Sequence, residues 1–139
     1  MEPITYRSNR LIKSEDLNHH RTLYAGRCAE WFVEAGFIAA ASVLPPHEIV
    51  CLKIHGLEFT KPMRSGQIAR FASKIVSVGR SSLVVYVTLS APDEEKPVVQ
   101  GFITFVHVDE LGRSQPHNLT LTLSDPEDIR LNEQAGKLR

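Results

Sequence analysis

The sequence predicts an α+β fold in which a mostly antiparallel sheet wraps around one long central helix. The first observation is a proline-free, alanine-rich segment over residues 24–43, typical of a helix. The second is the period-two alternation of apolar and polar residues in the segments that follow. The third is that their connections are short and contain glycine or proline, which favours antiparallel pairing. The expected order is therefore β-α-β-β-β-β.

The helix over residues 24–43 carries only three charged residues, Arg27, Glu30 and Glu34, and their spacing places them on one stripe. All its other residues are apolar or small, so we expect it to be surrounded by protein on nearly all sides. Two prolines directly after the segment end the helix.

One strand is expected before the helix and four after it. Their segments are residues 6–12, 49–59, 67–78, 82–90 and 98–108. In the fourth segment Leu83, Val85, Val87 and Leu89 share one face. A sheet with open edges commonly pairs with a second copy, so we expect the chain to self-associate.

The composition turns polar after residue 118, so we divide the chain into a domain over residues 1–118 and a tail over residues 119–139. The run SDPE at residues 124–127 resembles a capping box with an early helical proline. It predicts a short helix that ends near Ala135.

The composition excludes several classes of protein. Sixteen basic residues balance sixteen acidic ones, which argues against a nucleic-acid partner. Cys28 and Cys51 form neither a CxxC pair nor a Cys/His cluster, so we expect no metal site and no disulfide. We expect no signal peptide, because residues 1–10 carry charges and no apolar core. We expect no membrane span, because the longest apolar stretch, residues 31–44, is short and interrupted by Glu34. A cytoplasmic location is therefore expected.

Five short motifs occur in an order and spacing that is specific when they are taken together. They are residues 16–27 (DLNHHRTLYAGR), 30–35 (EWFVEA), 59–62 (FTKP) with Gly66, 78–82 (VGRSS) and 102–106 (FITFV). Over residues 5–118 this pattern resembles the hot-dog fold, and in particular its acyl-CoA thioesterase branch.

The resemblance implies an enzyme that hydrolyses an acyl-CoA thioester to free acid and coenzyme A, with water as the second substrate and no cofactor. It also implies homodimers that assemble into tetramers or hexamers, with sites between subunits. The sequence departs from the family pattern at three positions. Arg21 stands where the family usually has glycine, Ala25 replaces the first of two glycines, and Val33 occupies the position of the usual catalytic carboxylate.

The resemblance and the residue chemistry together indicate three catalytic candidates: Glu34, Asn18 and Gly26. Glu34, next to Val33, is the expected general base, because a partly desolvated carboxylate without a basic residue three or four places away suits that role. Glu30 is the alternative, but we expect it to pair with Arg27. Asn18 would orient water or polarise the carbonyl; its alternative is an ordinary turn residue.

The backbone N–H of Gly26, at the helix start, would stabilise the thioester oxyanion; the alternative is a glycine that only allows close packing. The coenzyme A phosphates would bind a separate cationic group. Arg80, Ser81 and Ser82, at a turn, offer charge and hydroxyl donors, and Lys61 and Arg64 add charge; the alternative is a polar hairpin.

Two rival functions remain at this point. A non-catalytic acyl-CoA-binding or sensing module is favoured by Val33, which cannot act as a base. A hydratase would need an Asp/His pair that we do not find, and His55 is expected to be a satisfied, partly buried histidine.

Overall fold

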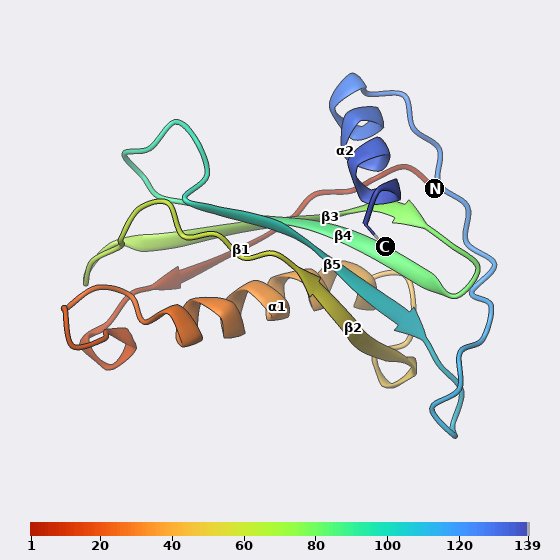
Figure 1. The fold of residues 1–139 in the computed structure, drawn as a ribbon, viewed down its shortest axis with the longest axis horizontal. Coiled ribbons are helices and arrows are strands. Elements are labelled where there is room, and N and C mark those ends of the chain that lie inside the picture. Colours follow the sequence, from red (N-terminus) through yellow and green to blue (C-terminus); the bar gives the residue numbers. More distant parts are fainter. Residues whose placement is uncertain (139) are drawn as a thin grey trace.

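The computed structural model describes residues 1–138, and it confirms the predicted β-α-β-β-β-β order and the C-terminal helix (Figure 1). The elements are β1 (Tyr6–Leu11), α1 (Ala25–Ala41), β2 (Ile49–His55), β3 (Ile68–Val78), β4 (Ser82–Ser90), β5 (Val99–His107) and α2 (Pro126–Gly136). Strand β2 is four residues shorter than predicted. It ends before Gly56, whose φ of 79° turns the chain out of the strand.

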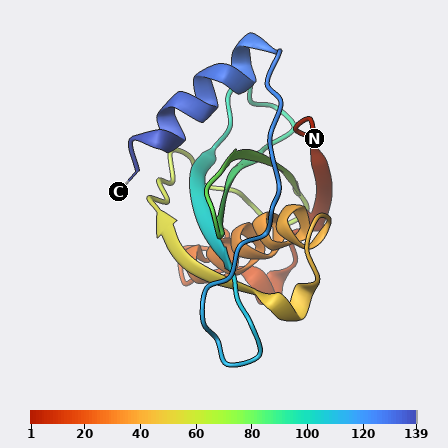
Figure 2. The same cartoon turned by 90° about the vertical axis from the view of Figure 1, so that its right-hand side faces the viewer.

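The five strands form one sheet in the order β1-β3-β4-β5-β2, and each neighbouring pair is antiparallel. The sheet curves around α1, as the end-on view in Figure 2 shows. The predicted alternation is confirmed in β3 and β4, where Phe71, Ile75, Leu83 and Val87 are buried between sheet and helix.

Helix α1 packs against the concave face of the sheet through small residues and two large ones, Trp31 and Phe32. A Cβ added to Gly36 would lie 2.8 Å from Cδ1 of Ile103, a distance that real Cβ atoms do not adopt. Gly36 therefore sets how closely the helix approaches the sheet.

The prediction that α1 is surrounded on nearly all sides is wrong for a single chain. Glu30, Glu34 and Ile38 are exposed on the face turned away from the sheet. The reason is that one curved sheet covers only one side of a helix, and α2 packs on the opposite face of the sheet (Figure 2).

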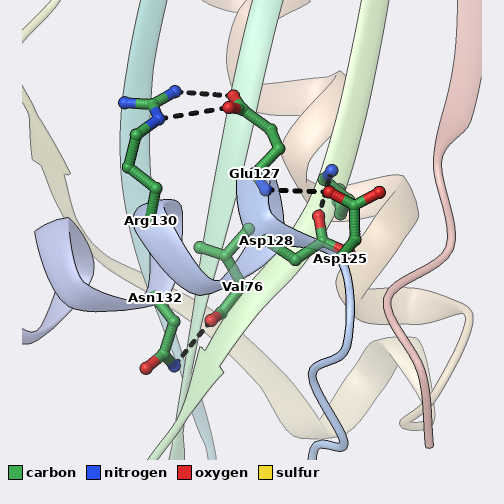
Figure 3. A network of polar contacts seen from close by, with 7 residues as sticks. Val76, Asp125, Glu127, Asp128, Arg130 and Asn132 are labelled. Atoms are coloured by element: carbon green, nitrogen blue, oxygen red, sulfur yellow. Dashed lines mark hydrogen bonds and ion pairs between the residues drawn. The ribbon is translucent and has the colours of Figure 1, made fainter.

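Helix α2 lies on the convex face of the sheet, where Leu131 and Ala135 form a small cluster with Val76. The pairing of β3 with β4 shifts between Ile75 and Ser77, so Val76 is the extra residue of a bulge. Its carbonyl accepts a hydrogen bond from Nδ2 of Asn132 at 2.9 Å (Figure 3). The division of the chain at residue 118 stays a prediction, although the tail helix packs directly on the sheet.

One ion pair joins the helix to the sheet, and a second lies within the helix. Lys74 of β3 binds Asp128 at 2.5 Å, and Arg130 binds Glu127 on the helix surface (Figure 3).

Within residues 1–138 no helix has both the length and the apolar character that crossing a membrane requires.

Candidate active site

A cavity of about 320 Å³ opens beside the first turn of α1. It lies between the helix start, the loop from β2 to β3, and the ends of β4 and β5 that face them. Its lining residues are Asn18, Thr22, Leu23, Ala25, Cys28, Phe59, Thr60, Lys61, Pro62, Met63, Leu89, Val98 and Val99. Of the predicted site residues, Asn18 and Lys61 line this cavity, whereas the other predicted residues do not.

Asp16 anchors the loop that leads into α1, and sequence analysis did not single it out. Its side chain is 1% exposed, accepts a hydrogen bond from the Lys13 backbone N–H at 2.9 Å, and pairs with Arg27 at 3.2 Å. The Leu23 N–H donates to the Met63 carbonyl at 2.8 Å. These bonds fix the helix start against the β2–β3 loop and so shape the cavity.

Asn18 serves the turn between residues 18 and 22. Its Oδ1 accepts hydrogen bonds from the backbone N–H groups of His20, at 2.8 Å, and Thr22, at 3.2 Å, and its Nδ2 contacts Oγ1 of Thr22 at 3.1 Å. The expected turn role is therefore present. The catalytic role of Asn18 stays a prediction, supported by its place on the cavity wall.

Arg21 lies in the left-handed region, with a φ of 62°. A side chain there is strained, whereas glycine is not. This conformation explains why a glycine suits this position better than the arginine that this chain carries.

The first turn of α1 presents backbone N–H groups beside the cavity. The Cys28 N–H donates to the Tyr24 carbonyl at 3.0 Å, and the amides that precede it have no intrahelical acceptor. Ala25 lines the cavity itself. A Cβ at Gly26 would lie 2.5 Å from a ring carbon of the exposed Tyr24, so a larger residue there would require that ring to move.

Glu34 differs from the expected base in two respects. Its side chain is 52% exposed, and its carboxylate pairs with the guanidinium of Arg10 on β1. The prediction of a desolvated, unpaired acid is therefore wrong for a single chain. Glu34 also lies about 12 Å along the helix from Gly26, at 1.5 Å per residue, and does not line the cavity.

The predicted pair of Glu30 with Arg27 is wrong as well. Arg27 binds the buried carboxylate of Asp16 instead, and Glu30 is exposed.

The expectation for His55 is confirmed: it is half-buried, and its Nε2 lies 2.6 Å from Oγ1 of Thr104. Burial and the nearby charge of Lys53 lower the pKa of His55.

The predicted phosphate-binding residues do not form one group in a single chain. Lys61 and Arg64 precede β3, whereas Arg80 and its neighbours Ser81 and Ser82 follow it. The eleven residues of β3 separate the two groups by roughly 30 Å, at about 3.3 Å per residue. Lys61 is also paired with Glu94, at 2.8 Å.

The sequence patterns did not reveal the apolar wall of the cavity, in particular Cys28 and Met63. Burial raises the pKa of Cys28 to about 12, so its thiol stays protonated and is a poor nucleophile. Its spacing of three residues from Ala25 could have shown that both share a helix face. None of the cavity-lining residues within the described chain carries a carboxylate or an imidazole.

Comparisons with known proteins agree with this architecture. An uncharacterised acyl-CoA thioester hydrolase of Bacillus subtilis is 28% identical over 105 residues, which cover 73% of this chain and 60% of that relative. The matched region thus spans less than two-thirds of the relative's length.

Two solved structures share the fold. An acyl-CoA hydrolase from Staphylococcus aureus, solved with butyryl coenzyme A, coenzyme A and coenzyme A disulfide, has a TM-score of 0.83 at 22% identity, covering 96% of this chain and 80% of that one. An apo-hexameric acyl-CoA thioesterase has a TM-score of 0.85 at 24% identity, and the match covers 95% of this chain and 86% of that one. These likenesses confirm the hot-dog fold.

The family itself follows from the sequence match. The model of the thioesterase superfamily matches residues 20–98, which is more than half of the chain and includes α1, the β2–β3 loop and most of the cavity wall. The chain belongs to the thioesterase superfamily.

Proposed function

We propose that this protein hydrolyses acyl-CoA thioesters to a free acid and coenzyme A. The observation that carries the proposal is the cavity at the amino end of α1, in a chain of the thioesterase superfamily. Its inner wall is apolar and suits an acyl chain, while its rim carries Asn18 and the first-turn amides of α1.

The chemistry follows from this arrangement. The thioester carbonyl oxygen becomes negative when water attacks, and the first-turn amides, with the positive end of the helix dipole, stabilise that charge. Asn18 would bind the water or the carbonyl through the second hydrogen of its Nδ2, because its Oδ1 already accepts from the His20 and Thr22 N–H groups. Water is the second substrate, and the proposal assigns no cofactor or metal.

The general base comes from a second copy of the chain. The described cavity lining offers no base, and Glu34 lies on the exposed face of α1, away from its own cavity. A partner docked on this face would place each Glu34 near the other copy's site. The exposed apolar residues Val50, Leu52 and Ile54 on the open edge of β2 favour such association.

The assembled protein is a homodimer or a further assembly of dimers, tetrameric or hexameric. The hexameric relative supports the larger form. Assembly also offers a role to Arg80, Ser81 and Ser82, which lie far from their own cavity. They would bind coenzyme A phosphates at another subunit's site, while Lys61 and Arg64 serve their own.

The alternative is an acyl-CoA-binding module without catalysis. It is favoured by Val33 at the usual carboxylate position and by the engagement of Glu34 with Arg10. Release of free thiol from a panel of acyl-CoA esters, acetyl to palmitoyl and aromatic, separates the two. We expect the protein to hydrolyse at least one ester much faster than the ester hydrolyses in buffer alone. Binding of the esters without hydrolysis would favour the alternative.

Light scattering tests the shared site separately. The proposal requires a mass of at least twice 15.6 kDa at micromolar concentration. An active monomer would leave hydrolysis standing and remove the assignment of Glu34 to a partner's site.

A further inference from the structure

We propose that the cavity beside α1 accepts only short and medium acyl chains, up to about eight carbons, and that the side chain of Met63 sets this limit. The inference rests on the proposed function and adds its substrate class. Three features of the cavity support it: its closed inner wall, its volume, and the origin of the Met63 side chain.

The inner wall is formed by five side chains that are almost completely buried. Their exposed fractions are 1% for Cys28, 3% for Met63, 1% for Leu89, 2% for Val98 and 2% for Val99. All five belong to the main hydrophobic core. Packed core therefore lies behind the wall.

The polar lining residues lie on segments that are half-buried or exposed, so they mark the open rim of the cavity. Asn18, Thr22, Thr60 and Lys61 make up this rim. A bound acyl-CoA would therefore place its polar thioester and coenzyme A at the rim and its acyl tail against the inner wall. The wall presents no charged group, because the Cys28 thiol is neutral, so the tail is expected to be uncharged.

The volume limits how much of that tail a single chain can enclose. A cavity of about 320 Å³ corresponds to about ten water volumes of about 30 Å³ each, and a methylene group occupies a similar volume. After the thioester atoms are placed, room remains for about eight carbons. A palmitoyl chain, with sixteen carbons, would have to leave part of its length in water.

Met63 is the wall residue best placed to set the limit. It comes from the β2–β3 loop, whereas the other four wall residues belong to α1 or lie on, or directly beside, β4 and β5. Its backbone carbonyl is held by the Leu23 N–H at 2.8 Å. Shortening its side chain would therefore widen the cavity without altering the sheet or helix that surround it.

The test is a chain-length series from acetyl to palmitoyl, measured in two ways. Hydrolysis is measured as kcat/KM, and binding is measured by calorimetry with S-alkyl coenzyme A thioethers, which cannot be hydrolysed. For the unmodified protein we expect both quantities to peak between four and eight carbons. Both should fall at least tenfold at sixteen.

Two variants should move this limit in opposite directions. Met63→Ala should raise the relative kcat/KM for ten- to twelve-carbon chains by about tenfold, and Met63→Leu, of similar volume, should leave the profile unchanged. Leu23→Phe, at the half-buried side of the cavity, should shorten the preferred chain, which keeps the test informative where Met63→Ala unfolds.

The outcomes separate the inference from the function on which it rests. A profile that rises to palmitoyl, or that neither variant shifts, overturns the chain-length limit while hydrolysis stands. A thioether series with the expected limit but no hydrolysis of any ester supports the limit and overturns the proposed activity. Absence of thioether binding at every length overturns both.

Discussion

The guanidinium of Arg10 on β1 pairs with the carboxylate of Glu34 on α1. Its central carbon, Cζ, lies 5.6 Å from the centroid of the Trp31 ring. The pair joins an edge strand to the exposed face of the helix. The two side chains are 40% and 52% exposed, and such surface pairs contribute at most about 1 kcal/mol. Glu34 can therefore exchange Arg10 for a water molecule at small cost.

The Arg10→Gln variant should confirm that this pair is weak. It removes the positive charge and keeps most of the stem over Trp31, so the free energy of unfolding should fall by less than about 1 kcal/mol. Urea denaturation measures this change. A loss of 3 kcal/mol or more would mean that Arg10 is a structural requirement of the fold.

Replacing two helix glycines by alanine should change the stability of the protein in opposite directions. Gly36→Ala should destabilise the protein by about 1–3 kcal/mol, because its Cβ would meet Ile103 at 2.8 Å. Gly136→Ala, in α2, meets nothing within 4 Å, so the better helix propensity of alanine should stabilise it by up to about 1 kcal/mol. Thermal unfolding of both variants is the measurement. Equal shifts of the same sign would contradict the close approach of α1 to the sheet.

Arg21→Gly should stabilise the fold. The φ of 62° strains a side chain but not glycine, and relief of that strain exceeds the added entropy of the unfolded chain, for a net gain of about 0.5–1 kcal/mol. His20→Gly, a change beside it where φ is not positive, should instead destabilise. A lower midpoint for Arg21→Gly in denaturant would show that the arginine side chain makes a compensating contact.

The fold was largely predictable because it depends on local periodicity. The alternation in β3 and β4 places Phe71 and Val87 on the buried face, and the composition of residues 24–43 predicts α1. The exposed half of α1 was not predictable in the same way. An apolar sequence indicates that the helix is buried, but it does not indicate whether its own chain or a partner chain buries it.

The site was only partly predictable because its contacts are long-range. The spacing of Arg27 and Glu30 suggests a pair, yet Asp16, which precedes the helix, binds Arg27 instead. The partner of Glu34 lies 24 positions away, outside any helical spacing rule. The separation of Arg80 from Lys61 was visible in principle, since an eleven-residue strand lies between them.

Cys28 should be unreactive in the folded protein. With a pKa of about 12, roughly one thiol in 10⁴ is ionised at pH 8, against about one in ten at the ordinary value of 9.0, so ionisation alone slows reaction about 10³-fold. In a Cys51→Ser background, Ellman's reagent should give almost no colour at pH 8 until guanidinium unfolds the protein. Rapid colour from the native variant would contradict a buried, protonated Cys28.

The general base is tested most directly by the matched pair Glu34→Gln and Glu30→Gln. Both carboxylates are exposed on α1, and each change keeps the shape of the side chain and removes its charge. With an acyl-CoA of four to eight carbons, Glu34→Gln should lower kcat/KM by roughly 10²-fold or more, because a general base of this kind contributes that much. Glu30→Gln should retain most activity, and both should bind coenzyme A as the unmodified protein does. Full activity in Glu34→Gln, or loss of activity in Glu30→Gln alone, would contradict the assignment of Glu34 as the base.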